Sequence, residues 1–166
     1  MKKELDEALC KDFPLIFRNR YTPRTLMCGG FDCRDGWEPI IRTLCESFMS
    51  EVYSLEEDVS MYESWLEREI DVIKKESIQK TLEDTKAKLD KAKDQVPVAV
   101  QVKEKFGGLR FYVNRASDKQ YSLISFAERM SYKTCEVCGS MQGTQLYKAG
   151  WHKTLCPQHA KELNYI

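Results

Sequence analysis

The chain has 166 residues, of which 42% are hydrophobic and 31% charged, enough for one buried core with an appendage. No stretch approaches the roughly 18–20 uninterrupted apolar residues of a membrane span, and the first residues lack the apolar core of a signal peptide. We therefore expect no membrane insertion, no secretion and a cytoplasmic location. In a reducing compartment, the odd number of seven cysteines favours metal-binding thiolates over disulfides.

The charges cancel overall, with 26 basic and 26 acidic residues, but they are unevenly distributed. Residues 46–95 carry 14 acidic and 8 basic side chains, a net charge of −6, whereas residues 96–166 carry 10 basic and 5 acidic ones, a net of +5. A basic half can bind phosphates, but the same asymmetry arises from solvation or from attraction between two halves of one fold. We favour the second explanation.

Residues 1–51 predict a short helix, a long loop and a second helix. The first helix presents Leu5, Leu9 and Cys10 on one face and ends at Asp12-Phe13-Pro14. A loop as long as the one that follows must be anchored or functional. Its expected apolar anchors are Phe13, Phe17, Leu26, Met27 and Phe31. The second helix should span about Trp37–Glu51 and bury Ile40, Ile41, Leu44, Phe48 and Met49.

Residues 52–95 contain neither glycine nor proline and predict an acidic, coiled-coil-like helical arm. Its apolar positions are Val52, Leu55, Val59, Tyr62, Leu66, Ile73, Ile78, Leu82, Leu89 and Ala92, followed by Val96. Their phase slips at residues 74–77, which fits a continuous helix with a stutter or an antiparallel pair turning there. We favour the antiparallel pair, acting as a spacer; a dimer or partner interface is the alternative.

Residues 96–132 predict a β-hairpin and a helix. Val98, Val100 and Val102 should share one face of the first strand, and Leu109, Phe111 and Val113 one face of the second, with a turn at residues 106–108. Ser117 and Gln120 form a capping-box pattern that opens a helix ending near Tyr132. This helix should bury Tyr121, Ile124, Ala127 and Met130.

Residues 133–166 contain the strongest motif, two pairs of metal-ligand residues separated by 17 positions. Cys135 and Cys138 form a C-x2-C knuckle, and Cys156 and His159 form a C-x2-H pair. Each pair can present its donors from one tight turn, so the four suit tetrahedral Zn²⁺. With a predicted hairpin between the pairs and a helix from Cys156, the segment resembles a treble-clef finger. Four protein ligands leave no position for water, so we expect structural zinc.

Two other metal-ligand sets are weaker. His152 could replace His159, but a strand residue four positions before Cys156 would have to fold back. A second site built from Cys10, Cys28, Cys33 and Cys45 would have no histidine, because none precedes residue 152. We assign Cys45 to the core and leave Cys28 and Cys33 open.

The motifs of common enzyme classes are missing from the sequence. A treble-clef nuclease needs a histidine base and further residues for Mg²⁺, and only His152 is left once His159 binds zinc. Residues 106–108 are a turn and not a phosphate-binding loop, and no histidine is placed to activate Cys10, Cys28 or Cys33. We therefore expect a protein that binds rather than catalyses.

Cations alternate with aromatic residues on the polar face of the central hairpin and on the zinc hairpin. Cations can contact phosphates while aromatic rings stack on bases, so this face is a candidate for a nucleotide-type ligand. An ordinary solvated sheet face is the alternative. The candidate contact residues are Lys103, Lys105, Arg110, Tyr112 and Trp151.

Several blocks together resemble small zinc-finger-containing proteins of tailed bacteriophages and prophages, most of them uncharacterised. These blocks are CKDFPLIF at 10–17, MCGGFDC at 27–33 before Asp35-Gly36-Trp37, VKEKFGGLRFYV at 102–113, and the C-terminal Cys-x2-Cys with Gly150-Trp151 and TLCPQH at 154–159. The likeness covers about two thirds of the chain, and the arm is longer than in such proteins. It implies a phage accessory protein acting in the bacterial cytoplasm, where such proteins often inhibit host systems, sometimes by sequestering nucleotide signals.

The sequence therefore predicts an α+β protein in four segments, 1–51, 52–95, 96–132 and 133–166. The leading hypothesis is a zinc-stabilised, non-enzymatic phage protein that counteracts a host defence by sequestering a nucleotide-type ligand or blocking a host component. The alternatives are a protein-interaction module, or a homo-oligomer, that uses the helical arm, and a nucleic-acid-binding protein that uses the basic half.

Overall fold

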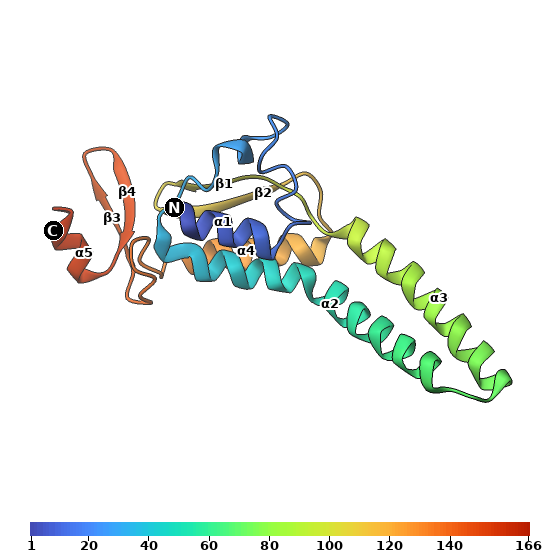
Figure 1. The fold of residues 1–166 in the computed structure, drawn as a ribbon. Coiled ribbons are helices and arrows are strands. Elements are labelled where there is room, and N and C mark those ends of the chain that lie inside the picture. Colours follow the sequence, from blue (N-terminus) through green and yellow to red (C-terminus); the bar gives the residue numbers. More distant parts are fainter. The chain divides into compact units, whose positions relative to one another are not determined.

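The computed structural model describes all 166 residues and has an α+β fold with five α-helices and two small antiparallel sheets (Figure 1). The helices are α1 (Lys3–Asp12), α2 (Glu38–Arg68), α3 (Val72–Gln95), α4 (Asp118–Ser131) and α5 (Pro157–Glu162), with 3₁₀ turns at Leu26–Gly29 and Asp35–Trp37. The strands are β1 (Ala99–Lys105), β2 (Gly108–Val113), β3 (Thr144–Lys148) and β4 (Trp151–Leu155). No helix has both the length and the apolar character needed to cross a membrane.

The chain divides into two compact units, residues 1–47 with 97–166, and residues 48–96. The core of the first unit is built around Trp37, Ile41, Val102 and Leu109, none of which is exposed. Phe17 packs edge-on against Phe31 at 5.0 Å between ring centroids and against Phe111 at 6.3 Å. The long loop therefore contributes directly to the core.

The long loop is also held by a buried ion pair. Asp6 on α1 accepts hydrogen bonds from Arg20 Nε at 2.8 Å and Nη2 at 3.0 Å, and Arg20 Nη1 donates to the carbonyl of Cys28. The expected anchors Phe13, Phe17, Met27 and Phe31 are buried, but the expectation for Leu26 was wrong, because it is 66% exposed. A polar anchor holds this part of the loop instead of the leucine.

The central hairpin turns through Phe106 and Gly107, which both have positive φ, as a tight two-residue turn requires. The expected alternation holds at Val102, Leu109 and Phe111, which are all buried. It fails at the start of β1, where Ala99 is fully buried although the alternation predicts it on the polar face. A register shift between Ala99 and Gln101 places Ala99 on the buried face, and Val98 is buried as expected.

Both edges of this two-stranded sheet are covered by short segments. On the β1 edge, the backbone of Asp32 forms an isolated β-bridge opposite Lys103. Its N–H donates to Val102 O, and its carbonyl accepts from Glu104 N. On the β2 edge, two side chains of α4 accept hydrogen bonds from the strand backbone: Ser131 Oγ from Leu109 N and Glu128 Oε1 from Phe111 N.

Helix α4 begins as predicted, with a complete capping box between Ser117 and Gln120 and a C-cap at Tyr132. Ile124 and Ala127 are buried as expected, and Met130 is partly buried. The expectation for Tyr121 was wrong, because it is 50% exposed. It lies in the first turn of the helix, outside the buried set of Ile124, Ala127 and Ser131.

The second unit is an antiparallel pair formed by the later part of α2 and by α3 (Figure 1). Glu63 pairs with Lys86 at 2.7 Å and Glu56 with Lys93 at 2.8 Å. The earlier residue of α2 pairs with the later residue of α3, so the two helices run antiparallel. The predicted helix end at Glu51 was wrong, because α2 continues without interruption to Arg68. No glycine or proline interrupts this stretch.

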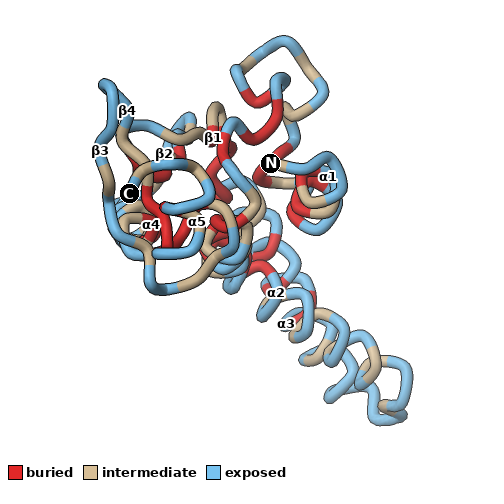
Figure 2. The backbone as a smooth tube through the Cα atoms, turned by 90° about the vertical axis from the view of Figure 1, so that its left-hand side faces the viewer, coloured by how far each residue is buried: buried red, intermediate tan, exposed pale blue.

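The turn of the arm lies at residues 69–71 and not at the expected 74–77. The Glu69 carboxylate accepts from the N–H groups of Ile70 and Asp71, and Asp71 then caps α3 by accepting from Lys74 N. Ile73, expected in the interhelical seam, is consequently 80% exposed in the first turn of α3. Figure 2 shows that the end of the arm near this turn has no buried residues.

The Asp6–Arg20 pair provides a test of what anchors the loop. Asp6→Asn leaves the Arg20 guanidinium largely buried without its counter-charge, so we expect a loss of about 2–3 kcal/mol in the free energy of unfolding. Asp12→Asn is the matched control, because Asp12 pairs with Arg42 with its side chain 46% exposed and should cost under about 1 kcal/mol. Urea unfolding followed by tryptophan fluorescence measures both; equal losses would contradict a special role for Asp6.

Candidate metal centre

The four predicted zinc ligands come together from two tight turns. Gly139 follows the first turn with φ +76°, and its N–H bonds to the carbonyl of Cys135 at 2.9 Å, which closes the knuckle. Cys156 is the N-cap of α5, with Pro157 in the first helical position, so one turn of helix carries His159 to the same point. Local backbone geometry therefore positions each pair independently.

The donor atoms are spaced as a tetrahedral metal requires. The distance from His159 Nδ1 is 3.1 Å to Cys156 Sγ and 3.5 Å to Cys135 Sγ, and Cys138 Sγ lies 3.9 Å from Cys156 Sγ. All four donors lie within 4.8 Å of one another. A regular tetrahedron with bonds of about 2.0–2.3 Å has edges of about 3.3–3.8 Å. The cluster can therefore hold a metal ion with shifts of about 1 Å or less.

The surroundings favour the thiolate of Cys156, whereas burial raises the pKa of Cys138. The backbone N–H of His159 and the His159 side chain stabilise the Cys156 thiolate and lower its pKa to about 7. The other ring nitrogen of His159, Nε2, lies 3.7 Å from a Glu162 carboxylate oxygen, the kind of partner that commonly orients a metal-bound imidazole. Nδ1 is thus the nitrogen that faces the sulfurs.

The alternative ligand sets are not assembled. His152 lies on β4 with its ring 4.8 Å from that of Tyr147 and 6.3 Å from that of Phe106, outside the group of donor atoms. Cys10, Cys28, Cys33 and Cys45 form no second group of metal ligands. Burial raises the pKa of both Cys10 and Cys33 to about 12, and Cys45 is fully buried, as expected for a core residue.

Gly36 and Trp37 pack against the Cys135–Cys138 knuckle within the first unit. Gly36 N donates to Glu136 O at 2.9 Å, and a Cβ atom on Gly36 would lie 2.2 Å from the carbonyl oxygen of Cys135. The fully buried Trp37 donates from its indole nitrogen to Thr134 O at 2.9 Å. Glycine is required here because two backbones touch, although its φ is not positive.

A cluster of charged residues around the buried Glu136 side chain adds a second link beside the knuckle. The Glu136 side chain is 1% exposed, and its Oε1 lies 3.2 Å from both Arg34 Nε and Lys153 Nζ. Lys153 also pairs with Glu104 on β1 at 3.3 Å. Burial raises the pKa of Glu136, while Lys153 and Arg34 oppose this effect. These residues surround a cavity of about 240 Å³.

The predicted ligand-binding residues are only partly brought together. Lys103 faces Arg110 across the hairpin, and its ammonium lies 5.8 Å from the centre of the Tyr112 ring. Arg110 donates to the hydroxyl of Tyr132 and lies over the Tyr132 ring. Lys105 adjoins the 106–107 turn and Trp151 adjoins the turn of the other hairpin. The structure thus groups Lys103, Arg110 and Tyr112, with Lys105 and Trp151 on separate turns.

Sequence reasoning missed the residues that hold the metal segment in place. Lys153 resembles the other cations of the zinc hairpin in sequence, yet its side chain is 21% exposed and bound between two carboxylates. Thr154, which is fully buried, donates to Gly107 O at 2.6 Å. No sequence signal singles these contacts out, because their partners lie far away in the chain.

Comparisons with protein-family models, with curated proteins and with solved structures each gave no match.

The close approach of Gly36 predicts a measurable coupling to metal binding. Gly36→Ala forces the knuckle away from residues 35–37, and we expect a loss of about 1–3 kcal/mol in unfolding free energy with weaker metal retention. Gly29→Ala is the control, since no atom lies within 4 Å of the point where its methyl group would sit and its φ is not positive. Thermal unfolding and competition with a chromogenic chelator measure the two effects; unchanged metal retention in Gly36→Ala would contradict the coupling.

Proposed function

We propose that Cys135, Cys138, Cys156 and His159 hold a structural Zn²⁺ in a treble-clef finger. The observation that carries this proposal is the set of four donor atoms within 4.8 Å of one another. Three thiolates and an imidazole suit Zn²⁺ better than the hard cations, which prefer oxygen ligands. The order of knuckle, hairpin β3–β4 and helix α5 supports the treble-clef assignment.

The zinc would supply folding free energy rather than chemistry. The buried cluster of the C-terminal segment consists of Cys135, Leu155, Cys156 and Ala160, and two of these four residues are metal ligands. A core this small cannot by itself offset the entropy of ordering about 30 residues, so metal binding and folding should be linked. Four protein ligands leave no open coordination position for a substrate.

We further propose that the protein is a phage accessory protein that acts by binding and counteracts a host defence. The resemblance of the sequence blocks supports the origin, and the cation–aromatic group of Lys103, Arg110 and Tyr112 supports a nucleotide-type ligand. Tyr112 is 40% exposed, so its ring is available for stacking, and the Lys103 ammonium lies 5.8 Å from the ring centre. Arg110 pairs with Lys103 across the hairpin, and its guanidinium lies over the Tyr132 ring. Lys105 and Trp151 would extend the contact from the neighbouring turns.

A protein-interaction role for the arm is the second candidate. Tyr53, Met61 and Trp65 of α2 are 40%, 37% and 48% exposed, although large apolar side chains of a paired helix usually lie in the seam. Such a stripe suits capture of a host or phage protein. This interaction should depend little on salt, in contrast to nucleic-acid binding by the basic half.

Metal content and ligand variants test the zinc proposal. Gently purified protein should contain close to one equivalent of zinc by mass spectrometry; His159→Ala should lose most of it, and His152→Ala, the matched control, should keep it. Thiol titration adds an independent count. Of the seven cysteines only Cys28, exposed and outside the cluster, should react while the metal is bound, and chelation should add Cys135, Cys138 and Cys156. Retention of zinc by His159→Ala would overturn the ligand set.

Binding assays with defined probes test the ligand proposal. The probes are cyclic di-AMP, cyclic di-GMP and a single-stranded oligonucleotide, each titrated at several salt concentrations. We expect Arg110→Ala and Lys103→Ala to weaken binding of the cyclic dinucleotide that binds best at least about tenfold, because each removes one of the two paired cations of the proposed contact face. Lys119→Ala on α4 is the control. Unchanged affinity would contradict the contact set, and a steep salt dependence restricted to the oligonucleotide would favour nucleic-acid binding.

A further inference from the structure

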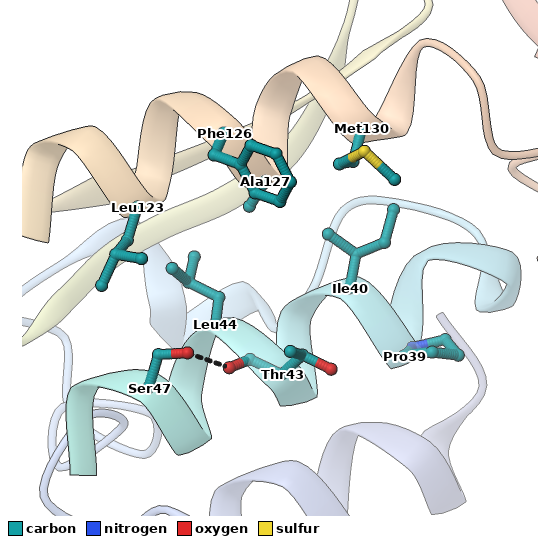
Figure 3. Close-up of a pocket in the computed structure, with 9 residues that line it drawn as sticks. All are labelled: Pro39, Ile40, Thr43, Leu44, Ser47, Leu123, Phe126, Ala127 and Met130. Atoms are coloured by element: carbon teal, nitrogen blue, oxygen red, sulfur yellow. Dashed lines mark hydrogen bonds between the residues drawn. The ribbon is translucent and has the colours of Figure 1, made fainter. Parts of the chain in front are cut away.

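An apolar groove lies between the first turns of α2 and helix α4, within the first unit (Figure 3). Its volume is about 360 Å³, and Ile40 and Leu44 line one side while Leu123, Phe126 and Met130 line the other. The one hydrogen bond drawn there runs from the Ser47 hydroxyl to the carbonyl of Thr43, so it is internal to α2. The groove is an order of magnitude larger than a water molecule and offers space for aliphatic side chains.

The groove has the character of an interface. Phe126 is 64% exposed, although it lies beside buried residues of the same helix. A contiguous apolar surface of this kind commonly marks a site of association. The adjoining cleft is lined by Arg129 and Lys133 together with Phe126 and Met130, so one rim of the groove is basic. A fitting occupant is therefore apolar at its centre and acidic at its edge.

The turn between α2 and α3 has these properties. Ile70, Val72 and Ile73 are 93%, 69% and 80% exposed, which makes the turn an apolar knob. Two carboxylates lie beside and between them, those of Glu69 and Asp71, and they fix the turn through hydrogen bonds to its backbone N–H groups. The basic residues Arg68, Lys74 and Lys75 flank this segment, so the acidic character of the arm comes from the unit as a whole. The knob is therefore presented in one conformation, which reduces the entropy cost of docking.

The charges of the two units are complementary as well. Residues 48–96 carry 13 acidic and 8 basic side chains, a net charge of −5, and the other residues carry 18 basic and 13 acidic ones, a net of +5. Two arms would repel each other, whereas an arm and the first unit of another molecule attract. This balance favours arm-to-body contact over pairing of two arms.

We propose that the Ile70–Ile73 knob of one molecule docks into the α2–α4 groove of a second copy of the chain. The contact joins two different surfaces, so it is heterologous, and an assembly keeps a free knob and a free groove unless it closes into a ring. Opposite charges steer the encounter, and burial of the aliphatic side chains with Phe126 stabilises the complex.

Sedimentation velocity of the full chain, from about 1 μM to about 1 mM, tests this proposal. The mean mass of the wild-type protein should rise with concentration. Ile70→Asp/Ile73→Asp and Phe126→Asp should each weaken the association at least about tenfold, because each places a charge in the contact. Tyr147→Asp is the matched control, an aromatic residue 65% exposed on β3 outside both surfaces.

A mixing experiment isolates the proposed contact. The knob variant retains a groove and the groove variant retains a knob, so an equimolar mixture should form a 1:1 complex that neither variant forms with itself. Circular dichroism checks that each variant is folded. A wild-type protein that stays monomeric, association that survives both variants, or a mixture that fails to form the complex would overturn the proposal. Loss of association on Trp65→Asp alone would assign it to pairing of arms instead.

Discussion

The approach of Gly36 to the Cys135–Cys138 knuckle is the constraint on which the rest of the first unit depends. The C-terminal segment is too small to bury a core of its own, so it needs both an internal cross-link and a surface to pack on. A metal ion held by the four donor side chains would supply the first requirement. Gly36 and Trp37 supply the second, because the Gly36 N–H and the Trp37 indole nitrogen donate to backbone carbonyls about a hundred positions later in the chain.

This arrangement explains why a charged residue occupies the knuckle. Glu136 lies between two metal-ligand positions, and its side chain points to Arg34 and Lys153, which come from the long loop and from β4. Lys153 in turn reaches Glu104 on the central hairpin. A buried carboxylate between two cations gains little net stability, but losing either cation would leave it poorly compensated. The cluster therefore helps specify how the metal segment is oriented on the hairpin.

Elements determined by neighbouring residues could be predicted from the sequence. The ligand pairs, the capping box at Ser117 and the two-residue turns each depend on a few adjacent positions, so spacing and residue type were sufficient. The position of the arm's turn was missed because Ile73 was assigned to the interhelical seam, which placed the turn after it, whereas Ile73 is 80% exposed. Side-chain bonds from Glu69 and Asp71 determine the turn instead.

The remaining errors came from contacts between distant parts of the chain. The buried face of Ala99 follows from a register shift that no alternation pattern reveals. Hydrophobicity alone favours Leu26 as a core residue, but the Asp6–Arg20 pair anchors that part of the loop. For the same reason the sequence indicated neither the requirement for glycine at position 36 nor the partners of Lys153. Each depends on a surface that exists only after folding.

The central hairpin is a two-stranded ribbon without an open edge. Asp32 occupies hydrogen-bonding groups on one border, and the side chains of Glu128 and Ser131 occupy amides on the other. An extended peptide, or a strand of another molecule, would therefore have few unpaired backbone groups to bond to at these edges. Single residues and the end of helix α4 thus shield the edges of this short sheet from pairing with another strand. Larger proteins commonly use whole additional strands for the same purpose.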